Sequence, residues 1–220
     1  AALSVAAVAA AIAAVAFLTY RAAPGAGGAP VRRPLSRRTL SAALSTGATW
    51  GFFNGALAVV FGFGVALLVS RGVDVGAAGQ VTSLTMIALA LVGPLGGMIA
   101  DRTGRYLSLI TGATLVMAAL LAAIAAGQSS TWLFLAFGAV CGLAAGPVMS
   151  LAGQYLPPEE RGAGMGVFFT VYYICIMVTP AIAGYAADIA GLAEAAFVAG
   201  IVFCVLTLAS MAALPLLRPR

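Results

Sequence analysis

The feature that most constrains this chain is a succession of seven apolar runs, each about 20 residues or longer, separated by short stretches that hold the charges and turn-forming residues. A helix needs about 20 apolar residues to cross the roughly 30 Å hydrocarbon core of a bilayer. Backbone polar groups in lipid must find hydrogen-bond partners within their own segment, so these runs are predicted to be helices rather than strands. The sequence therefore predicts an all-α integral membrane protein, with spans at 1–20, 43–69, 77–100, 106–126, 131–155, 164–187 and 195–217.

The composition agrees with a membrane protein and excludes several classes of function. Charged residues make up 8% and hydrophobic residues 63% of the 220, whereas a soluble domain carries roughly a quarter charged residues. All eleven basic residues are Arg, scattered between apolar runs, which argues against a nucleic-acid-binding face. There is no His, and Cys141, Cys175 and Cys204 lie far apart, so no metal site, haem site or disulfide scaffold is expected. We expect no cofactor and no enzyme active site.

The arginines sort by side of the membrane when the seven spans alternate in direction. Cytoplasmic loops carry an excess of Lys and Arg, so the Arg-rich side is predicted to be cytoplasmic and to receive the C-terminus. The outer side holds only Arg71, together with Asp74, Asp188 and Glu194. Arg-only basic usage with abundant Ala and Gly favours a bacterial protein of the cytoplasmic (inner) membrane. The arginines of the predicted cytoplasmic side are Arg21, Arg32, Arg33, Arg37, Arg38, Arg102, Arg105, Arg161, Arg218 and Arg220.

The longest connection, residues 21–38, combines Pro and Gly with five Arg. This composition is typical of a flexible linker held to the inner membrane face by anionic lipid. We interpret it as a tether between a leading span, 1–20, and a six-span block, 39–220; a regulatory or lipid-contacting segment is the alternative. The chain starts with Ala, already apolar, so it is interpreted as a piece of a longer protein. A secretory signal at 1–20 is disfavoured, because Arg follows the apolar run instead of preceding it.

The six-span block shows an internal repeat of three spans plus three. Small residues at four-residue spacing, which let a neighbouring helix approach closely, occur in the leading span of each triplet. A Pro lies at a comparable depth in each middle span and is expected to bend it. Inverted repeats of this kind are common in secondary transporters. The matched residues are Gly47, Gly51 and Gly55 with Gly138, Gly142 and Gly146, and Pro94 with Pro180.

A charged loop joins the second and third spans of this block on the predicted cytoplasmic side. Gly97 is expected to permit close helix contact, and Asp101 can accept hydrogen bonds from the exposed N–H groups at the start of another helix. Gly104 permits a tight turn, while Arg102 and Arg105 anchor the loop at the inner surface. The segment reads Gly97-Met98-Ile99-Ala100-Asp101-Arg102-Thr103-Gly104-Arg105.

This loop resembles the signature of the major facilitator superfamily, G-x-x-x-D-[RK]-x-G-[RK]. The family usually has a further basic residue where Tyr106 stands here, which puts part of the expected charge network in doubt. The resemblance implies helices six to twelve of a twelve-helix transporter: 1–20 as the sixth helix of a missing N-terminal half, 21–38 as a cytoplasmic basic linker, and 39–220 as the C-terminal bundle. It also implies that Asp101 docks against the N-terminal half.

A second cytoplasmic loop carries Glu159, Glu160 and Arg161 ahead of the span at 164–187. It is similar to the family's connection between helices ten and eleven. Negative charge at a helix start is favourable, so capping explains the two Glu. The alternative is a gating role, in which Arg161 forms a salt bridge at an inner gate.

Polar residues in the middle of spans are costly in lipid and are therefore the candidates for a solute pathway. Trp50 and Asn54 are four apart and share a helix face; Gln80 lies near an outer end; Tyr172 and Tyr173 belong to the most polar stretch. The resemblance implies that the helices carrying them line the cavity. The alternatives are Ser and Thr bonded to their own helix, and Trp or Tyr in an interfacial belt. No ionisable residue lies in mid-span, so a proton-coupling carboxylate would belong to the N-terminal half.

The resemblance implies a secondary active transporter that moves a small solute by alternating access, with the lipid bilayer and the N-terminal half as partners. The segments Thr49-Trp50-Gly51-Phe52-Phe53-Asn54-Gly55-Ala56-Leu57 and Phe61-Gly62-Phe63 resemble the cyanate-permease-like branch, whose substrates include small anions. The alternatives are a proton-coupled drug or metabolite exporter and, more distantly, a non-transporting membrane receptor or assembly subunit.

Overall fold

The computed structural model describes residues 11, 13–18 and 34–217. The chain divides into two compact units, Ala1–Pro34 and Leu35–Arg220. In the first unit residues 11 and 13–18 are helical. The rest of the predicted span 1–20, the linker through residue 33 with Arg21, Arg32 and Arg33, and the terminal Arg218 and Arg220 lie outside the described residues.

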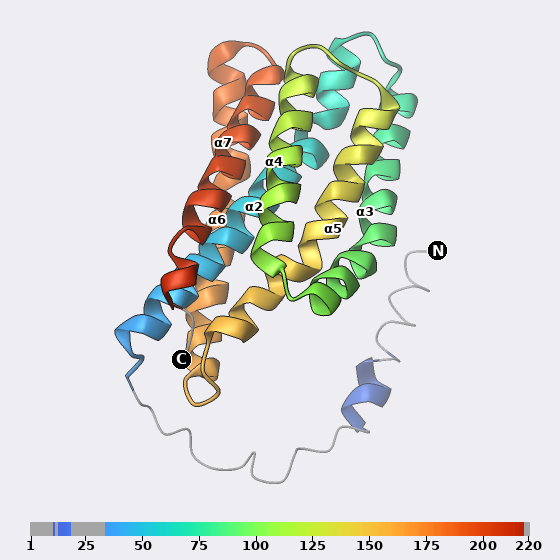
Figure 1. Ribbon diagram of the computed structural model, residues 1–220. Helices are drawn as coiled ribbons and strands as arrows, with labels where there is room; N and C mark the ends of the chain where they lie inside the picture. Colours follow the sequence, from blue (N-terminus) through green and yellow to red (C-terminus); the bar gives the residue numbers. More distant parts are fainter. Residues whose placement is uncertain (1–10, 12, 19–33, 218–220) are drawn as a thin grey trace. The chain divides into compact units, whose positions relative to one another are not determined.

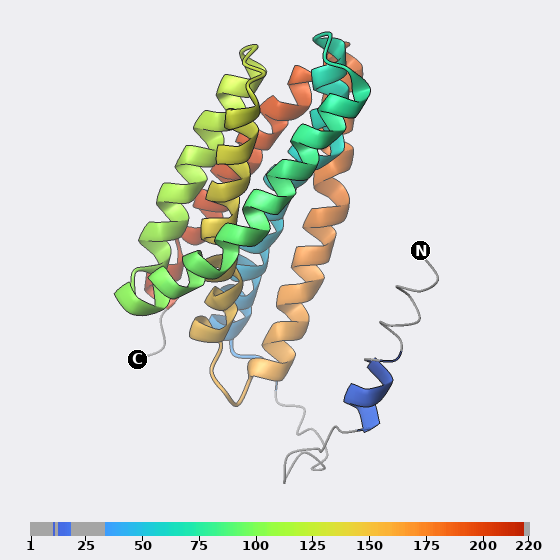
Figure 2. The same ribbon diagram turned by 90° about the vertical axis from the view of Figure 1, so that its right-hand side faces the viewer.

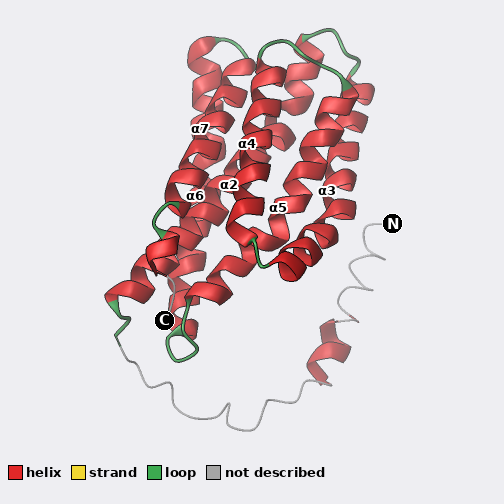
Figure 3. Cartoon of the chain, viewed as in Figure 1, coloured by secondary structure: helices red, strands yellow, loops and turns green. Residues whose placement is uncertain are grey.

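The second unit is a bundle of long helices, and its described part contains no strand (Figure 3). Six helices are long and apolar enough to cross a membrane within the described part of the chain, which confirms the predicted all-α membrane fold. The helices are α2 Arg37–Ser70, α3 Val75–Thr103, α4 Tyr106–Ala125, α5 Thr131–Tyr155, α6 Arg161–Ala190 and α7 Glu194–Met211, followed by the 3₁₀ turn η1 Leu214–Leu217.

The helix ends differ from the predicted spans where local chemistry extends or stops a helix. The helix α2 begins at Arg37, inside the predicted linker, because Ser36 caps it by accepting a hydrogen bond from the Thr39 backbone N–H at 3.2 Å. At the other end of the chain, α7 stops at Met211 instead of running through residue 217. Pro215 falls within the 3₁₀ turn that follows, and it cannot supply the N–H that a continuing α-helix requires.

The two triplets of helices, α2–α4 and α5–α7, pack against each other more extensively than within themselves. The first helix of one triplet, α2, lies against α6 and α7, and the first helix of the other, α5, lies against α3 and α4 (Figures 1 and 2). Each leading helix thus contacts the second and third helices of the opposite triplet. This symmetric packing confirms the repeat that the sequence predicted. Pro94 and Pro180 lie inside α3 and α6, which are the middle helices of the two triplets.

The glycine series make the contacts between triplets. A Cβ added to Gly47 would lie 2.7 Å from the Phe168 backbone oxygen of α6, and one added to Gly55 would lie 2.6 Å from the Thr179 hydroxyl oxygen. On the other side, a Cβ at Gly142 would lie 2.5 Å from the Leu89 backbone oxygen of α3. A Cβ cannot lie this close to atoms of the neighbouring helix. The close approach of α2 to α6 and of α5 to α3 therefore depends on glycine at these positions.

At the predicted outer side of the membrane, Arg71 ties helix ends together. Its guanidinium forms an ion pair with Glu194 at the start of α7, with Nη2 and Oε1 3.0 Å apart. It also donates to the Ile124 backbone oxygen near the end of α4 at 2.8 Å, and to the Gln128 backbone oxygen and the Ser129 hydroxyl at 3.1 Å. One side chain therefore joins the ends of α2 and α4 and the start of α7.

We predict that Gly142→Ala lowers stability by about 1–3 kcal/mol, because its methyl group would collide with backbone that no rotamer change can move. Gly62→Ala is the matched control: nothing lies within 4 Å of its added Cβ, so the substitution leaves stability equal or slightly raised. Thermal unfolding in detergent micelles measures both. Equal unfolding temperatures for Gly142→Ala and the unmodified protein would show that the α5–α3 seam does not need glycine.

We also predict that Arg71→Gln destabilises the bundle by about 1–2 kcal/mol, because Glu194 and the end of α4 lose their hydrogen-bond donor. A double-mutant cycle with Glu194→Gln in the same unfolding assay measures the coupling. Arg105→Gln, which changes an exposed arginine, serves as control. A coupling energy of zero would mean that the ion pair does not hold the outer ends together.

Candidate functional site

The helices α3 and α6 flank α2 and make little or no contact with each other (Figure 2), and we call the side of the bundle where they flank it the open side. These two helices are the least buried of the six membrane-length helices. Both carry large exposed apolar side chains, including Met86 and Leu91 on α3 and Met177 on α6. Exposed apolar side chains on these two helices need a cover of lipid or protein.

A pocket of about 270 Å³ lies in this open side, with α2 supplying most of its lining. Asn54 is its one polar lining residue, and the Asn54 amide nitrogen donates to the Trp50 backbone oxygen at 2.8 Å. That bond fixes the side chain and leaves the amide oxygen as an acceptor for a bound molecule. The lining residues are Asn54, Leu57, Ala58 and Phe61 of α2, Met86 and Leu89 of α3, and Ile176 of α6.

Next to this pocket, six side chains of α2 and α6 form a continuous aromatic cluster. The Trp50 ring lies parallel to Phe53, with centroids 5.9 Å apart, and stacks on Tyr172 at 6.0 Å. The contacts continue from Tyr172 to Tyr173 at 4.9 Å. The structure thus brings together four of the five pathway residues that the sequence singled out. The aromatic cluster consists of Trp50, Phe53, Phe168, Phe169, Tyr172 and Tyr173.

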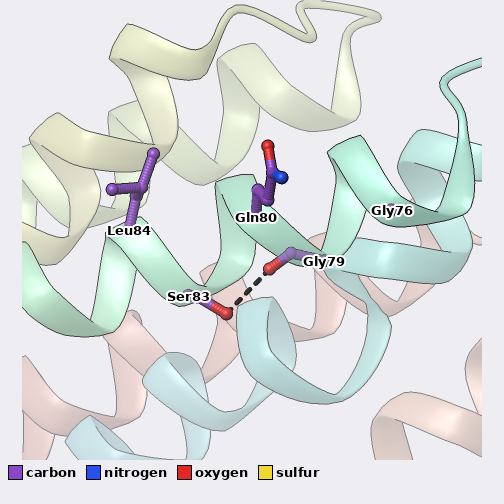
Figure 4. Close-up of a pocket in the computed structure, with 5 residues that line it drawn as sticks. All are labelled: Gly76, Gly79, Gln80, Ser83 and Leu84. Atoms are coloured by element: carbon purple, nitrogen blue, oxygen red, sulfur yellow. Dashed lines mark hydrogen bonds between the residues drawn. The ribbon is translucent and has the colours of Figure 1, made fainter.

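The fifth pathway residue, Gln80, lies elsewhere. It is exposed and lines a separate depression of about 500 Å³ formed by α3 with Gly76, Gly79, Ser83 and Leu84 (Figure 4). The Ser83 hydroxyl donates back to the Gly79 carbonyl at 2.9 Å. Other hydroxyls also bond to their own helices, as the alternative interpretation anticipated: those of Thr85, Ser150, Thr170 and Thr179.

The signature loop has the predicted turn, and Gly97 lies at a close helix contact. Gly104 ends α3 with φ +65°, a left-handed conformation that suits glycine. A Cβ added to Gly146 of α5 would lie 3.4 Å from the Gly97 backbone nitrogen, so the two helices approach closely there. Nothing lies within 4 Å of a Cβ at Gly97, however, whereas one added to Gly96 would collide with the Leu143 backbone oxygen. On α3 the contact therefore requires glycine at residue 96, one position before the residue that the sequence singled out.

Asp101 lies in the last turn of α3, where it accepts a hydrogen bond from the Tyr106 hydroxyl. The tyrosine that replaces the family's usual basic residue is thus the partner of the loop carboxylate. Arg102 and Arg105 are exposed, and neither forms an ion pair within the described residues. Within those same ranges, no group of three or more His, Cys, Asp or Glu could hold a metal ion.

The loop between α5 and α6, which the sequence predicts to be cytoplasmic, links the starts of α6 and α2 through hydrogen bonds. Glu160 makes no side-chain cap on α6; its carboxylate accepts from the Ser36 hydroxyl at 3.0 Å and the Ser36 backbone N–H at 3.3 Å. Hydrogen bonding from Thr39, together with these bonds from Ser36, lowers the pKa of the Glu160 carboxyl. Arg161 donates to the Gly153 and Leu156 backbone oxygens near the end of α5, at 3.3 and 3.4 Å.

Glu159, the other acidic residue of this loop, is exposed. Glu160 is the N-cap residue of α6, but its carboxylate bonds to Ser36 instead of making a capping hydrogen bond. The favourable effect of its negative charge at the start of α6 stays a prediction. The gate role of Arg161 stays a prediction.

The sequence also matches known proteins. A family model described as "Major Facilitator Superfamily" matches residues 39–220. The protein "Multidrug resistance protein MdtG" from Dickeya zeae (strain Ech586) is 32% identical over 127 residues, which cover 56% of this chain and 31% of that relative. The match therefore spans about a third of the relative's length.

We predict that Glu160→Gln removes an acid-sensitive contact between α2 and α6. Because the hydrogen bonds lower the folded-state pKa, their stabilisation is fully present above the ordinary value of 4.5 and is lost as pH falls through the lowered value. The unfolding temperature of the unmodified protein should therefore fall more steeply than that of Glu160→Gln on acidification below about pH 4.5. Glu159→Gln is the control. Parallel curves for all three proteins would contradict the assignment.

Proposed function

The chain belongs to the major facilitator superfamily, and on that premise we propose that it is the C-terminal part of a secondary active transporter that moves a small organic solute by alternating access. In this proposal residues 1–20 form the sixth helix of the transporter, 21–38 the cytoplasmic linker and 39–220 the C-terminal bundle. The missing partner is the N-terminal half of the same transporter, which covers the open side between α3 and α6.

The observation that carries this proposal is the pocket at Asn54. Small-molecule sites are concave, mostly apolar, and contain a few polar groups that orient the ligand. The pocket has this character, with one oriented amide among apolar side chains from three helices. It also opens on the side of the bundle that the N-terminal half would face, so a solute bound there lies between the two halves.

The chemistry of the pocket favours an organic solute over a small anion. No charged side chain lines the pocket. The arginines nearest to it along the chain lie at the two ends of α2: Arg37 and Arg38 at the start, and Arg71 just after the last residue. An anion moved into such a site loses its hydration without gaining a cation, which is costly. The relative from Dickeya zeae is named a multidrug resistance protein, and drugs are in general organic molecules. The cyanate-permease-like alternative would need a cation from the N-terminal half.

Alternating access requires each half to move as one body, and the contacts within the bundle supply that rigidity. Glycine seams join α2 to α6 and α5 to α3. Arg71 ties the outer ends, and the Ser36–Glu160 contact ties two inner ends. These contacts leave the groove between α3 and α6 as the place where the bundle meets the other half.

We also propose that the membrane is the bacterial inner membrane and that the C-terminus is cytoplasmic. The described arginines support this orientation. Arg37, Arg38, Arg102, Arg105 and Arg161 lie at the end of the bundle that holds the α3–α4 and α5–α6 loops, opposite to Arg71 (Figure 1). The excess of arginine marks the cytoplasmic side.

The test is solute flux into vesicles that hold the full-length protein, with an imposed proton gradient. We predict that Asn54→Ala lowers the flux of transported organic solutes by about tenfold, because the pocket loses its only oriented hydrogen-bond partner. Gln128→Ala, which removes the side-chain amide from the outer α4–α5 loop, should leave flux unchanged.

Each other outcome points to a different function. Gradient-dependent flux of cyanate, lost in Asn54→Ala, would favour the small-anion alternative. Absence of flux for every member of a broad panel of anions and organic solutes would favour a receptor or assembly subunit. Equal flux in Asn54→Ala and the unmodified protein would exclude the pocket as part of the pathway.

A further inference from the structure

We propose that the aromatic cluster is a stacking surface for planar aromatic solutes, so that the transported solute contains a flat ring system. This inference rests on the proposed function and names the class of solute. The proposed stacking surface lies on α2 and α6, next to the pocket at Asn54. We therefore predict that a flat ring system, rather than charge, decides which molecules bind.

The cluster is anchored in the core and open at its other end. Phe53 and Phe168 are almost fully buried, with exposed fractions of 1% and 0%, whereas Tyr173 is 58% exposed. Trp50, Phe169 and Tyr172 are half-buried between these extremes. The buried rings hold the partly exposed rings in place, so a ligand that stacks on them does not have to order flexible side chains.

The position of the cluster also argues against an interfacial belt. Trp50 lies about 20 Å along α2 from Arg37, and Tyr172 about 17 Å along α6 from Arg161, at 1.5 Å per residue. Both rings are therefore well inside the membrane span rather than at the headgroups, where Trp and Tyr usually gather. Aromatic side chains at this depth on an open face are available to a bound molecule.

Three polar groups on the cluster are unused within the described part of the chain. The Trp50 indole N–H and the hydroxyls of Tyr172 and Tyr173 form no hydrogen bond to another described residue. They can donate to acceptor atoms at the edge of a flat ligand while the ring faces provide stacking. The faces also attract a positive charge on the ligand by cation–π interaction.

The cluster and the pocket are continuous. Asn54 donates to the backbone of Trp50 one turn earlier, and Ile176 of the pocket lies one turn after Tyr172 and Tyr173. A planar molecule stacked on the exposed rings can therefore extend toward the Asn54 amide oxygen. The pocket receives the apolar end of such a molecule, and the cluster receives its aromatic end.

The experiment measures binding and transport separately in the full-length protein. Binding of ethidium, a planar aromatic monocation, is followed by its fluorescence in detergent micelles, and flux is followed in vesicles. Tetraethylammonium, which has the same charge without rings, and cyanate are the comparison probes. We expect Trp50→Leu and Tyr173→Leu each to raise the half-saturating ethidium concentration about tenfold, because each removes one stacking partner.

Two further variants separate stacking from structure. Tyr173→Phe keeps the ring and should retain most of the binding, whereas Tyr185→Leu removes an exposed tyrosine of the same helix outside the cluster and should have no effect. Thermal unfolding confirms that each variant is folded. Equal ethidium affinity in both Leu variants and the unmodified protein, or tetraethylammonium binding as tight as ethidium binding, would overturn the inference.

The outcomes distinguish this inference from the proposed function. Ethidium binding that depends on the cluster, without flux of any solute, would support the stacking surface and contradict the transporter. Flux of cyanate or tetraethylammonium without ethidium binding would support the transporter and overturn the stacking surface.

Discussion

Contact between backbones at glycine is the interaction on which the rest of this bundle depends. Lipid tails are as apolar as Leu, so burial from water does not drive membrane helices together and close van der Waals packing must do so. Gly47 and Gly55 bring α2 onto α6, and Gly142 brings α5 onto α3. Because each pair joins opposite triplets, the two halves of the repeat are interlocked, and neither triplet has a separate core.

The same packing decides where the open groove lies. Gly51 and Gly55 face α6, so Trp50 and Asn54, each one residue earlier on α2, are turned by about 100° and border the space between α3 and α6. The glycine seam therefore positions both the pocket amide and the aromatic rings. A change in helix separation would move the candidate site together with the fold.

The contacts of charged side chains lie at the ends of the helices. Arg71 joins three segments at the proposed outer end. The Ser36–Glu160 and Tyr106–Asp101 pairs lie at the proposed inner end. These groups reach water, where charge is inexpensive, whereas the middle of the bundle contains no ionisable carboxylate or arginine among the described residues. Because charged groups are absent from the described middle of the bundle, the proposed binding site offers a solute aromatic stacking, apolar contact and the single amide of Asn54.

The sequence by itself determined the six long helices of the bundle to within several residues at their ends, the repeat and the turn at Gly104, because bilayer thickness, glycine spacing and a positive φ act within a few residues along the chain. Only the tertiary structure decided that Gly96 rather than Gly97 is the position of α3 where a side chain would collide with α5. It also decided that Glu160 bonds Ser36, 124 residues away, and that Gln80 lies apart from Asn54. These features depend on how each helix is rotated about its axis and on partners distant in the chain, which no local pattern encodes.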